Sequence, residues 1–348
     1  MRRVSWTVVW TLAMAAGDPP PAAWFTTSPV PPSCAGVRGL VDQFMQRHAG
    51  RRIVLVSSGG TTVPLERNTV RFIDNFSTGS RGSKSVECFL EADYAVIFLH
   101  RTGSMEPFSE LKALLTRDIL SSHATQRVEG GFTSVSRGSR EELAAAERLK
   151  RIYETCVERD ERLLRLPFTS VFEYLHSLKA ACEGMHPAGS RAMIYLAAAV
   201  SDYFVPDEEM AEHKIQSSSG DLALTLRPTP KCLSLLKHNW CPQALIVSFK
   251  LETDTEILID KATGAIQKYG VDCVVANLLQ TRNTEVQVIV RTARTETVQA
   301  FRAFEPIPGG DFAKLTVSVH ERGDVPQIER PLVETMARIH EGFAANTG

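Results

Sequence analysis

Polar side chains and glycines gather in residues 71–82, which read Arg-Phe-Ile-Asp-Asn-Phe-Ser-Thr-Gly-Ser-Arg-Gly. Ser77, Gly79 and Gly82 stand where a helix would begin, and the first N–H groups of a helix lack partners within it and bind anions. Arg71 can pair bidentately with a phosphate or carboxylate, and Asn75 can hold a carbonyl or an amine without adding charge. An ordinary helix cap beside a surface arginine is the alternative, but the density of polar groups favours an anion site.

A second glycine-rich turn, Ser57-Ser-Gly-Gly-Thr-Thr, follows a predicted buried strand. Without a Cβ, Gly59 and Gly60 would let main-chain N–H groups approach phosphate oxygens, and Thr61 belongs to the same turn. The turn matches neither G-x-G-x-x-G nor a Walker A loop. A phosphate-binding loop and a tight turn without a ligand therefore stay equally open.

Small and polar residues also follow the predicted strand 192–199. Ala197 and Ala198 would permit close approach of a ligand, although tight helix–sheet packing needs small residues too. Asp202 could orient a substrate or cap the next turn. Lys214 lies in a polar loop, where a lysine can neutralise a polyphosphate, whereas a solvated loop lysine is the ordinary interpretation of that residue alone.

Two further candidates follow the next predicted strands. Phe249 could stack on a nucleobase and Asn277 could form hydrogen bonds with it; a core aromatic and a turn asparagine are the alternatives. The histidines have no triad or ligand spacing, and neither G-x-S-x-G nor H-E-x-x-H occurs. Covalent serine catalysis and zinc hydrolysis therefore lack their usual residues.

Five apolar, β-rich segments would position these groups, namely 52–57, 94–99, 192–199, 244–249 and 271–276. Helical patterns cover 37–48, 86–90, 141–158, 169–185, 230–238, 255–269 and 332–343, and further β-rich segments are 222–226, 286–291 and 314–319. Strand, helix and strand between 52 and 99 form a βαβ unit, which is typical of parallel sheets. The sequence predicts a doubly wound, Rossmann-like α/β fold with a mainly parallel sheet and a small antiparallel β appendage. Ligands bind beyond the carboxyl ends of such strands.

Composition is compatible with this fold and excludes other classes. The chain has 348 residues, 43% of them hydrophobic, with 39 basic against 40 acidic side chains. It can therefore bury a sizeable core, and it has no net charge to attract nucleic acid or an anionic membrane. Seven scattered cysteines without a C-x-x-C pair are expected to be reduced thiols in a cytoplasmic protein.

The first 35 residues are expected to form a flexible, proline-rich leader. Arg2 and Arg3 before the apolar run 4–17 have the outline of a secretory or organelle signal, whereas a start at Met14 would make that outline an artefact of the gene model. We favour a start at Met14, because the chemistry expected of the downstream segments is intracellular. Residues 36–348 would form one α/β domain with an insertion at about 100–138. No apolar run elsewhere is long enough to span a membrane.

Taken in order, these segments resemble phosphopantothenoylcysteine synthetase, the phosphopantothenate–cysteine ligase, in its free-standing eukaryotic type. Ser248-Phe-Lys-Leu-Glu-Thr-Asp and Val274-Val-Ala-Asn complete the set, and the resemblance runs from about 41 to 345. It implies amide synthesis in coenzyme A production. The carboxylate of 4′-phosphopantothenate would attack the α-phosphate of ATP, pyrophosphate would leave, and the amine of L-cysteine would displace AMP from the acyl-adenylate. Bacterial members are expected to use CTP, and Mg²⁺ would neutralise the phosphates.

The resemblance also implies a role for each candidate. Asn75 would hold the acyl group, and Lys214 would stabilise charge on the nucleotide phosphates. Phosphopantothenate would be bound by Arg71, Ala197, Ala198 and Asp202. The nucleotide would be bound by Gly59, Gly60, Thr61, Ser77, Gly79, Gly82, Phe249 and Asn277. A homodimer, joined through the antiparallel appendage, would contribute loops to the partner's site. Neither a metal ligand nor a nucleic-acid or membrane partner is implied.

The sequence departs from the family pattern in two places, and two other classes of function are compatible with parts of it. Bacterial members carry a basic pair in the helix before the last core strand, whereas Lys261 and Lys268 are offset here, so the choice between ATP and CTP is less firmly indicated than the fold. The segment 100–138 matches nothing in the family. A catalytically silent nucleotide-binding regulatory subunit is the first alternative, which loss of Asn75 or Lys214 would have favoured. An NAD(P) oxidoreductase is the second, but it lacks G-x-G-x-x-G after the first strand.

Overall fold

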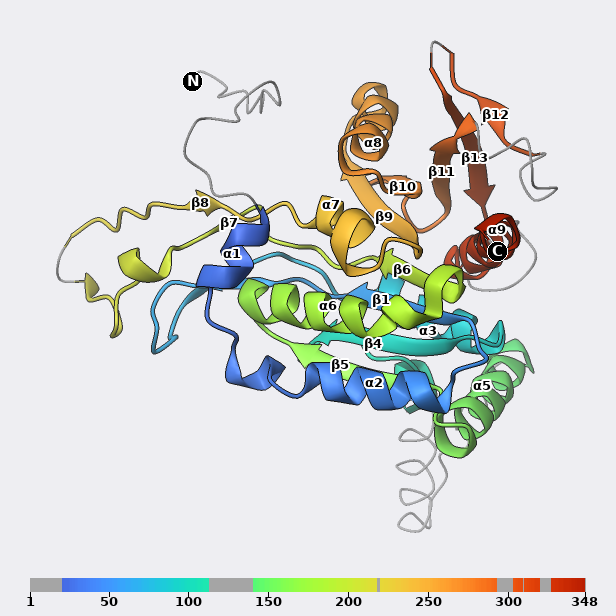
Figure 1. Cartoon of the computed structure of the whole chain (residues 1–348), viewed down its shortest axis with the longest axis horizontal. Coiled ribbons are helices and arrows are strands. Elements are labelled where there is room, and N and C mark those ends of the chain that lie inside the picture. The colour runs from blue at the N-terminus through green and yellow to red at the C-terminus, as the bar shows by residue number, and fades with distance from the viewer. Residues whose placement is uncertain are drawn as a thin grey trace, which may run out of the picture.

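Nine strands form one sheet through the middle of the protein (Figure 1). The structure is a computed structural model that describes residues 21–112, 140–217, 220–292, 303–308, 310–319 and 327–347. In spatial order the strands are β12 (Glu305–Pro306), β13 (Phe312–Ser318), β11 (Glu285–Arg291), β10 (Cys273–Leu278), β9 (Leu245–Glu252), β6 (Ala192–Leu196), β1 (Ile53–Ser58), β4 (Ala95–Arg101) and β5 (Leu163–Phe168). The predicted α/β class is thereby confirmed.

The sheet is parallel from β5 to β10, and β11, β13 and β12 continue it antiparallel. In the register of the central strands, Ile53 lies opposite Ala95 on one side and Ala192 on the other. From β1 the chain first builds β4 and β5 on one side, and then crosses back to build β6, β9 and β10 on the other. The order of the strands therefore reverses between β1 and β6, where open α/β sheets bind their ligands.

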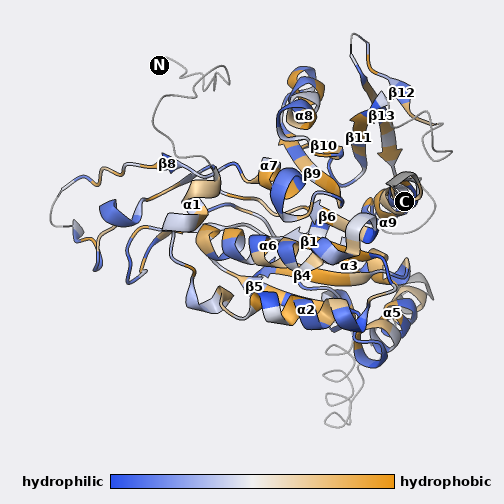
Figure 2. Cartoon of the chain, in the orientation of Figure 1, coloured by the Kyte–Doolittle hydropathy of each residue, from blue (hydrophilic) through white to orange (hydrophobic). Residues whose placement is uncertain are grey.

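Helices cover both faces of this sheet. One face carries α2 (Val37–Arg47), α6 (Val171–Met185) and α8 (Thr255–Tyr269), and the other carries α3 (Ser80–Glu91), α5 (Arg140–Ile152) and α9 (Glu329–Thr347). Because both faces are covered, the central strands are almost continuously apolar, as the orange ribbon of Figure 2 shows. Alternate residues of β1 face opposite cores, with Leu55 on the α6 side and Val56 on the α3 side.

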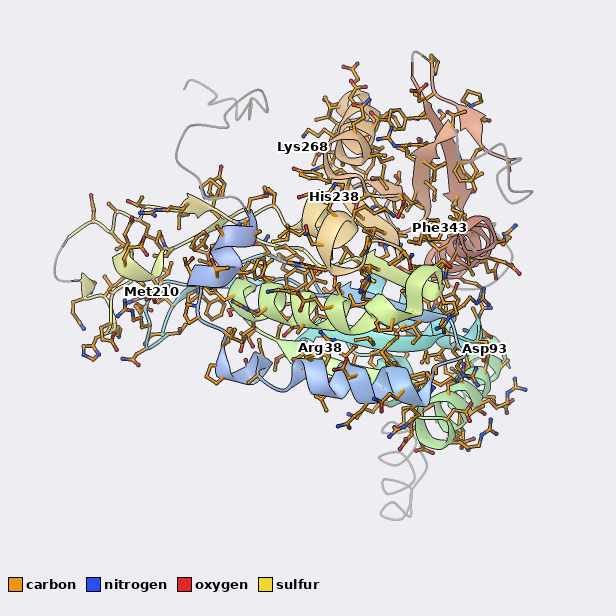
Figure 3. The ribbon with its side chains drawn as sticks, viewed as in Figure 1. Arg38, Asp93, Met210, His238, Lys268 and Phe343 are labelled. Atoms are coloured by element: carbon orange, nitrogen blue, oxygen red, sulfur yellow. The ribbon has the colours of Figure 1, made fainter. Side chains whose placement is uncertain are left out.

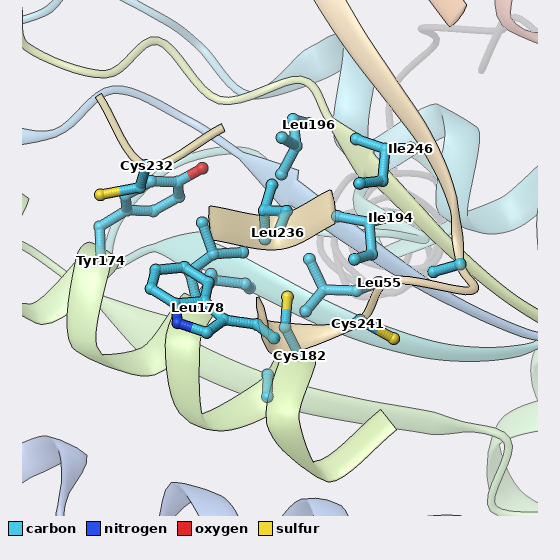
Figure 4. Packing of buried hydrophobic residues seen from close by; sticks show 14 of the residues in the cluster. Leu55, Tyr174, Leu178, Cys182, Ile194, Leu196, Cys232, Leu236, Cys241 and Ile246 are labelled. Carbon is cyan, nitrogen blue, oxygen red and sulfur yellow. The ribbon is translucent and has the colours of Figure 1, made fainter. Parts of the chain in front are cut away.

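The core on the α6 side includes the short helix α7 (Leu233–Leu235) and the helical turn Leu236–Trp240 that continues it. Figure 4 shows Leu236 among Leu178 of α6, Leu55 of β1 and Ile194 of β6. Helix α6 begins with a capping box, in which Ser170 and Glu173 each bond the other's main-chain N–H. The helix is thus fixed in direction where it packs beneath β1.

Residues 21–35, expected to belong to a flexible leader, are folded onto the domain. They form α1 (Pro21–Thr27) and the single turn Pro32–Cys34. The rings of Trp24 and Phe25 lie 5.4 and 5.5 Å from that of His176 on α6, and Phe25 lies 5.1 Å from Trp240. Residues 1–20 lie outside the described residues.

The expected insertion at about 100–138 begins inside the domain. Strand β4 runs to Arg101, and Phe108 and Leu111 are buried against α3 and α5. Residues 113–139 lie outside the described residues. None of the described helices is long and apolar enough to cross a membrane.

The sequence did not predict one parallel strand of the nine-stranded sheet, and it predicted one strand that the structure does not contain at that place. Strand β5 was not predicted, since Pro167 interrupts its apolar pattern, but β5 is an edge strand, where proline is tolerated. The strand predicted over 222–226 is wrong. Its alternating leucines are 36–52% exposed, and the nearest strand is β8 (Arg227–Pro228), which pairs with β7 (Tyr203–Phe204). A second small sheet joins β2 (Thr62–Pro64) to β3 (Phe72–Asp74).

Candidate active site

The turns that follow β1 and β6 lie side by side at the reversal point of the sheet. The N–H of Thr61 donates to the carbonyl of Ala199 at 3.0 Å, and the N–H of Ala199 donates to the carbonyl of Gly59 at 2.8 Å. Strand β6 ends at Leu196, three residues before the predicted end. Ala197 and Ala198 therefore belong to the turn, where small side chains leave room above the sheet.

Buried hydroxyl groups fix these two turns. The N–H of Ala198 donates to Oγ of Ser57 at 3.3 Å, and the N–H of Ser201 donates to Oγ1 of Thr61 at 2.9 Å. Thr61 is fully buried, and its main-chain oxygen accepts from the N–H of Asn75 at 3.2 Å. The N–H and the carbonyl of Thr61 are thus both used within the protein, and its hydroxyl accepts one hydrogen bond, so Thr61 shapes the turn.

The glycines of the site allow close approach of other parts of the chain. A Cβ on Gly60 would lie 1.7 Å from the carbonyl oxygen of Asn75, and one on Gly82 would lie 2.4 Å from Cβ of Ser58. Gly59 and Gly79 have φ angles of 86° and 79°, which disfavour other residues. The glycines at 60 and 82 are thus required for packing of Asn75 and helix α3 against β1.

Helix α3 begins beside the end of β1 and has no side-chain cap at its N-terminus. Oγ of Ser58 donates to the carbonyl of Gly79 at 2.9 Å, and the N–H of Met105 donates to the carbonyl of Thr78 at 2.9 Å. Ser77 accepts the N–H of Gly79 at 3.4 Å. The preceding turn is thus held firmly, and the N–H of Ser80, the first in α3, donates to Oγ1 of Thr78 at 3.4 Å. Helix N-termini placed in this way beside the carboxyl edge of a sheet are typical phosphate-binding positions.

Asn75 follows β3 directly and is held there by its main chain. Its side chain is half-buried and makes no hydrogen bond with any residue that the structure describes. The amide therefore keeps two donors and one acceptor for a ligand. It lies between the turn after β1 and the start of α3, beside the glycines of both turns.

A buried carboxylate organises the loop between β2 and β3. Glu66 is fully buried and accepts from the N–H groups of Val70, Arg71 and Ile215 and from Nη1 of Arg71, at 2.9–3.4 Å. Burial alone would raise the pKa of Glu66, but these hydrogen bonds hold it below its usual value. Arg71, predicted to bind a phosphate, is thus first the partner of Glu66; its side chain remains 39% exposed.

The same loop fixes the backbone around Lys214. The N–H groups of Arg67 and Asn68 donate to the carbonyls of Ala211 and Glu212 at 2.9 and 3.1 Å. The side chain of Lys214 is exposed, and within the described part of the chain it forms no ion pair. Lys214 is therefore an exposed cation, without an ion pair to any described residue, on a loop tied to the hairpin that carries Asn75.

Asp202, in contrast, already has a cationic partner. Its carboxylate accepts from Nζ of Lys231, and its carbonyl accepts from the N–H of Thr229 at 2.8 Å. The Asp202 side chain is 63% exposed. It can still meet a substrate at the end of β6, but together with Lys231.

Phe249 and Asn277 lie on neighbouring strands farther along the same edge. The ring of Phe249 packs edge-on against Tyr195 at 4.8 Å. Asn277 is 5% exposed, and its Nδ2 donates to the carbonyls of Lys250 and Val275 at 3.3 and 3.2 Å. Its Oδ1 is buried without a hydrogen-bond partner. Buried acceptors are normally satisfied, so this oxygen is suited to a ligand that donates an N–H.

Glu66 and Arg101 do not stand out in the sequence, yet both contact the site. Arg101 ends β4, and its Nη1 donates to Oδ1 of Asp74, the neighbour of Asn75. Arg101 lies two residues beyond the predicted strand 94–99. The rule that ligand-binding residues follow the carboxyl ends of parallel strands could therefore have identified it from the sequence. Glu66 has no comparable signal.

Known proteins share this sequence and fold. Residues 175–302 match the family model of the DNA/pantothenate metabolism flavoprotein C-terminal domain. The human phosphopantothenate–cysteine ligase is 39% identical over 329 residues, which cover 90% of this chain and 95% of that protein. Phosphopantothenate–cysteine ligase 1 of Oryza sativa subsp. japonica is 43% identical over 294 residues, covering 81% and 88%.

Solved structures agree with these relatives. A Cab2 mutant superposes with a TM-score of 0.73 at 36% identity and covers 94% of this chain and 98% of its own. A Cab2 mutant in complex with phosphopantothenate-cysteine has a TM-score of 0.70 at 36% identity, covering 93% and 99%. The identity and coverage of these proteins show that this chain belongs to the phosphopantothenate–cysteine ligase family.

Proposed function

We propose that this protein joins 4′-phosphopantothenate to L-cysteine in coenzyme A biosynthesis, at the expense of a nucleoside triphosphate. The unpartnered amide of Asn75, held between the turn after β1 and the start of α3, is the observation that supports this most directly. A neutral group in that position can hold a carboxylate during activation and an incoming amine afterwards.

The reaction proceeds in two displacements. A carboxylate oxygen of phosphopantothenate attacks the α-phosphorus, the bond to pyrophosphate breaks, and an acyl-adenylate forms. The cysteine nitrogen then attacks the acyl carbon, loses a proton, and displaces the nucleoside monophosphate. Activation is needed because a carboxylate is a poor acyl donor to an amine until one of its oxygens is part of a good leaving group. Lys214 is exposed, and among the described residues it has no ion-pair partner, so it could stabilise phosphate charge as that charge moves.

The nucleotide lies along the carboxyl edge of the sheet in this proposal. Its phosphates meet the start of α3, and its base meets Phe249 and the buried Oδ1 of Asn277. An acceptor at that point favours a base with an exocyclic amino group, which adenine and cytosine have. The resemblance to eukaryotic members favours ATP over CTP.

Mg²⁺ would be held chiefly by the nucleotide. In the described ranges no three His, Cys, Asp or Glu residues cluster as metal ligands. Magnesium in such enzymes keeps several waters and binds substrate phosphates. Its chemistry would be to neutralise phosphate charge.

Phosphopantothenate lies at the end of β6, next to Ala197, Ala198 and the Asp202–Lys231 pair, with Arg71 near its phosphate. The alanines leave room there, and the pair offers both a donor and an acceptor. The guanidinium of Arg71 retains donors beyond those used by Glu66 and Ile215.

We also propose that the protein is a homodimer, and exposed apolar side chains indicate where the two subunits would meet. Phe72, Ile73 and Phe76 beside the small β2–β3 sheet are 50%, 37% and 92% exposed, and Tyr203 of β7 is 52% exposed. Contiguous apolar patches mark protein contacts. The antiparallel appendage, expected to form the interface, has no large exposed apolar residue among its described residues. We therefore place the interface at the hairpin, where a partner's loops would reach the site.

We place the reaction in the cytoplasm. None of the seven cysteines forms a disulfide, and six of them are buried. Free buried thiols are typical of reducing compartments.

The test is incubation of the purified protein with phosphopantothenate, L-cysteine, Mg²⁺ and either ATP or CTP. Mass spectrometry should detect the amide product and an equal amount of nucleoside monophosphate. No amide with either nucleotide would overturn the proposal. Nucleotide binding without any product would instead support the silent regulatory subunit.

A further inference from the structure

The hairpin that leads into Asn75 is anchored in the domain through β2, whose Thr62 N–H donates to the carbonyl of Thr169 at 3.0 Å and whose Val63 is buried. Strands β2 and β3 have three residues each, and all three residues of β3 are exposed. Two-stranded hairpins are marginally stable when nothing packs on them. The position of Asn75 therefore depends on contacts that join β3 to the nine-stranded sheet.

Arg101 provides such a contact from the carboxyl end of β4. A Cβ on Gly59 would lie 2.7 Å from Cβ of Arg101, so the arginine stands directly against the turn after β1. Its side chain is only 18% exposed and reaches Asp74, whose carboxylate is its ion-pair partner. The pair spans from the sheet to the last residue of β3.

We propose that Arg101 is a positioning residue for the ligase reaction, because its ion pair with Asp74 fixes the hairpin end that carries Asn75. This inference rests on the proposed function. Asn75 is held from three sides: its N–H bonds to Thr61, its carbonyl packs on Gly60, and its neighbour Asp74 is tied to Arg101. Only the last of these contacts is made by a side chain and can be removed without changing the main chain.

The pair should affect turnover far more than stability. Partly exposed ion pairs contribute little to folding, whereas a displacement of about 1 Å at a reacting group can lower the rate roughly 100-fold. Loss of kcat with an unchanged melting temperature and nearly unchanged KM values is therefore the expected pattern. A residue that contacts the nucleotide directly would instead change its KM.

The experiment compares Arg101→Ala, Asp74→Asn, Arg101→Lys and the double variant Arg101→Ala/Asp74→Asn with the wild type. We expect each of the first two to lower kcat about 10- to 100-fold, with Arg101→Lys recovering most of the activity. The double variant should be no slower than Arg101→Ala alone, because the two residues act as one pair. Amide hydrogen exchange in residues 60–78 should be faster in both single variants.

Arg51→Ala is the matched control. Arg51 pairs with Asp93 at the opposite end of β1 and β4; Figure 3 labels Asp93 at that end, far from Met210 in the loops on the other side. Its kcat should equal that of the wild type.

Three results would overturn the inference. They are a normal kcat for Asp74→Asn, additive losses in the double variant, and unchanged hydrogen exchange over 60–78. A wild type that makes no amide would contradict the proposed function instead, and the exchange measurement would still decide whether the pair holds the hairpin.

Discussion

Replacing Gly60 with alanine tests how closely the turn after β1 must approach Asn75. The new Cβ would lie 1.7 Å from the carbonyl oxygen of Asn75, whereas real Cβ contacts essentially never fall below 3.0 Å. The oxygen must therefore move away by at least 1.3 Å, which is the difference between these two distances. A shift of about 1 Å can lower a rate roughly 100-fold, which corresponds to about 2.7 kcal/mol of barrier. We therefore expect Gly60→Ala to lower kcat about 100-fold.

The assay is the initial rate of nucleoside monophosphate release with all substrates saturating, together with a thermal melt. Gly39→Ala on α2 is the control, because its Cβ meets nothing within 4 Å. Alanine is favoured over glycine in helices by about 1 kcal/mol, so this variant should keep full activity and melt no lower than wild type. A kcat for Gly60→Ala within about threefold of wild type, less than 1 kcal/mol of barrier, would refute the reasoning.

Four further predictions follow from the site and the core. Asn75→Asp should lower kcat at least about 100-fold with an unchanged melting temperature, because a second carboxylate repels the substrate's; a near-normal rate would remove Asn75 from the mechanism. Lys214→Ala should lower kcat about 100-fold and leave the nucleotide KM nearly unchanged, whereas a change confined to KM would make Lys214 a binding residue only. Phe76→Asp should convert a dimer to a monomer in sedimentation, and a wild-type monomer would contradict the proposed interface. Burial raises the pKa of Glu87 from 4.5 to about 7, so folding stability falls as pH rises between these values; Glu87→Gln should stabilise the protein at pH 8, by up to about 3 kcal/mol in urea unfolding, and hardly at pH 5. Equal gains at both pH values would contradict this assignment.

The core strands could be predicted because they are buried on both faces. Strands β1, β4, β6, β9 and β10 are short aliphatic runs, which only a sheet covered by helices on both sides needs. Strand β5 escapes this rule because an edge strand tolerates Pro167 and exposed residues. At residues 222–226 a strand was predicted that does not form. Alternating leucines form a strand only where a neighbouring strand is available to pair with them.

Site residues could be predicted where their role follows from their position along a strand. They could not be predicted where their role follows from a contact between segments that are distant in the sequence. Asp202 lies beyond the end of β6, as the sequence indicates, and Asn277 is the next-to-last residue of β10. Glu66 acquires its role from Ile215, 149 residues away, and Arg101 from Asp74, 27 residues away. Gly60 was expected to let a phosphate approach the main chain, and the group that lies against it in the structure is the carbonyl of Asn75.

Transfer of oxygen from substrate to nucleotide tests the central claim most directly. Phosphopantothenate labelled with ¹⁸O in its carboxylate is incubated with the enzyme, L-cysteine, Mg²⁺ and ATP, and the products are analysed by mass spectrometry. An acyl-adenylate places one ¹⁸O in AMP and leaves one in the amide, because the attacking oxygen stays with the phosphorus that it joins. Unlabelled AMP, or label in inorganic phosphate with release of ADP, would contradict the mechanism proposed for this site.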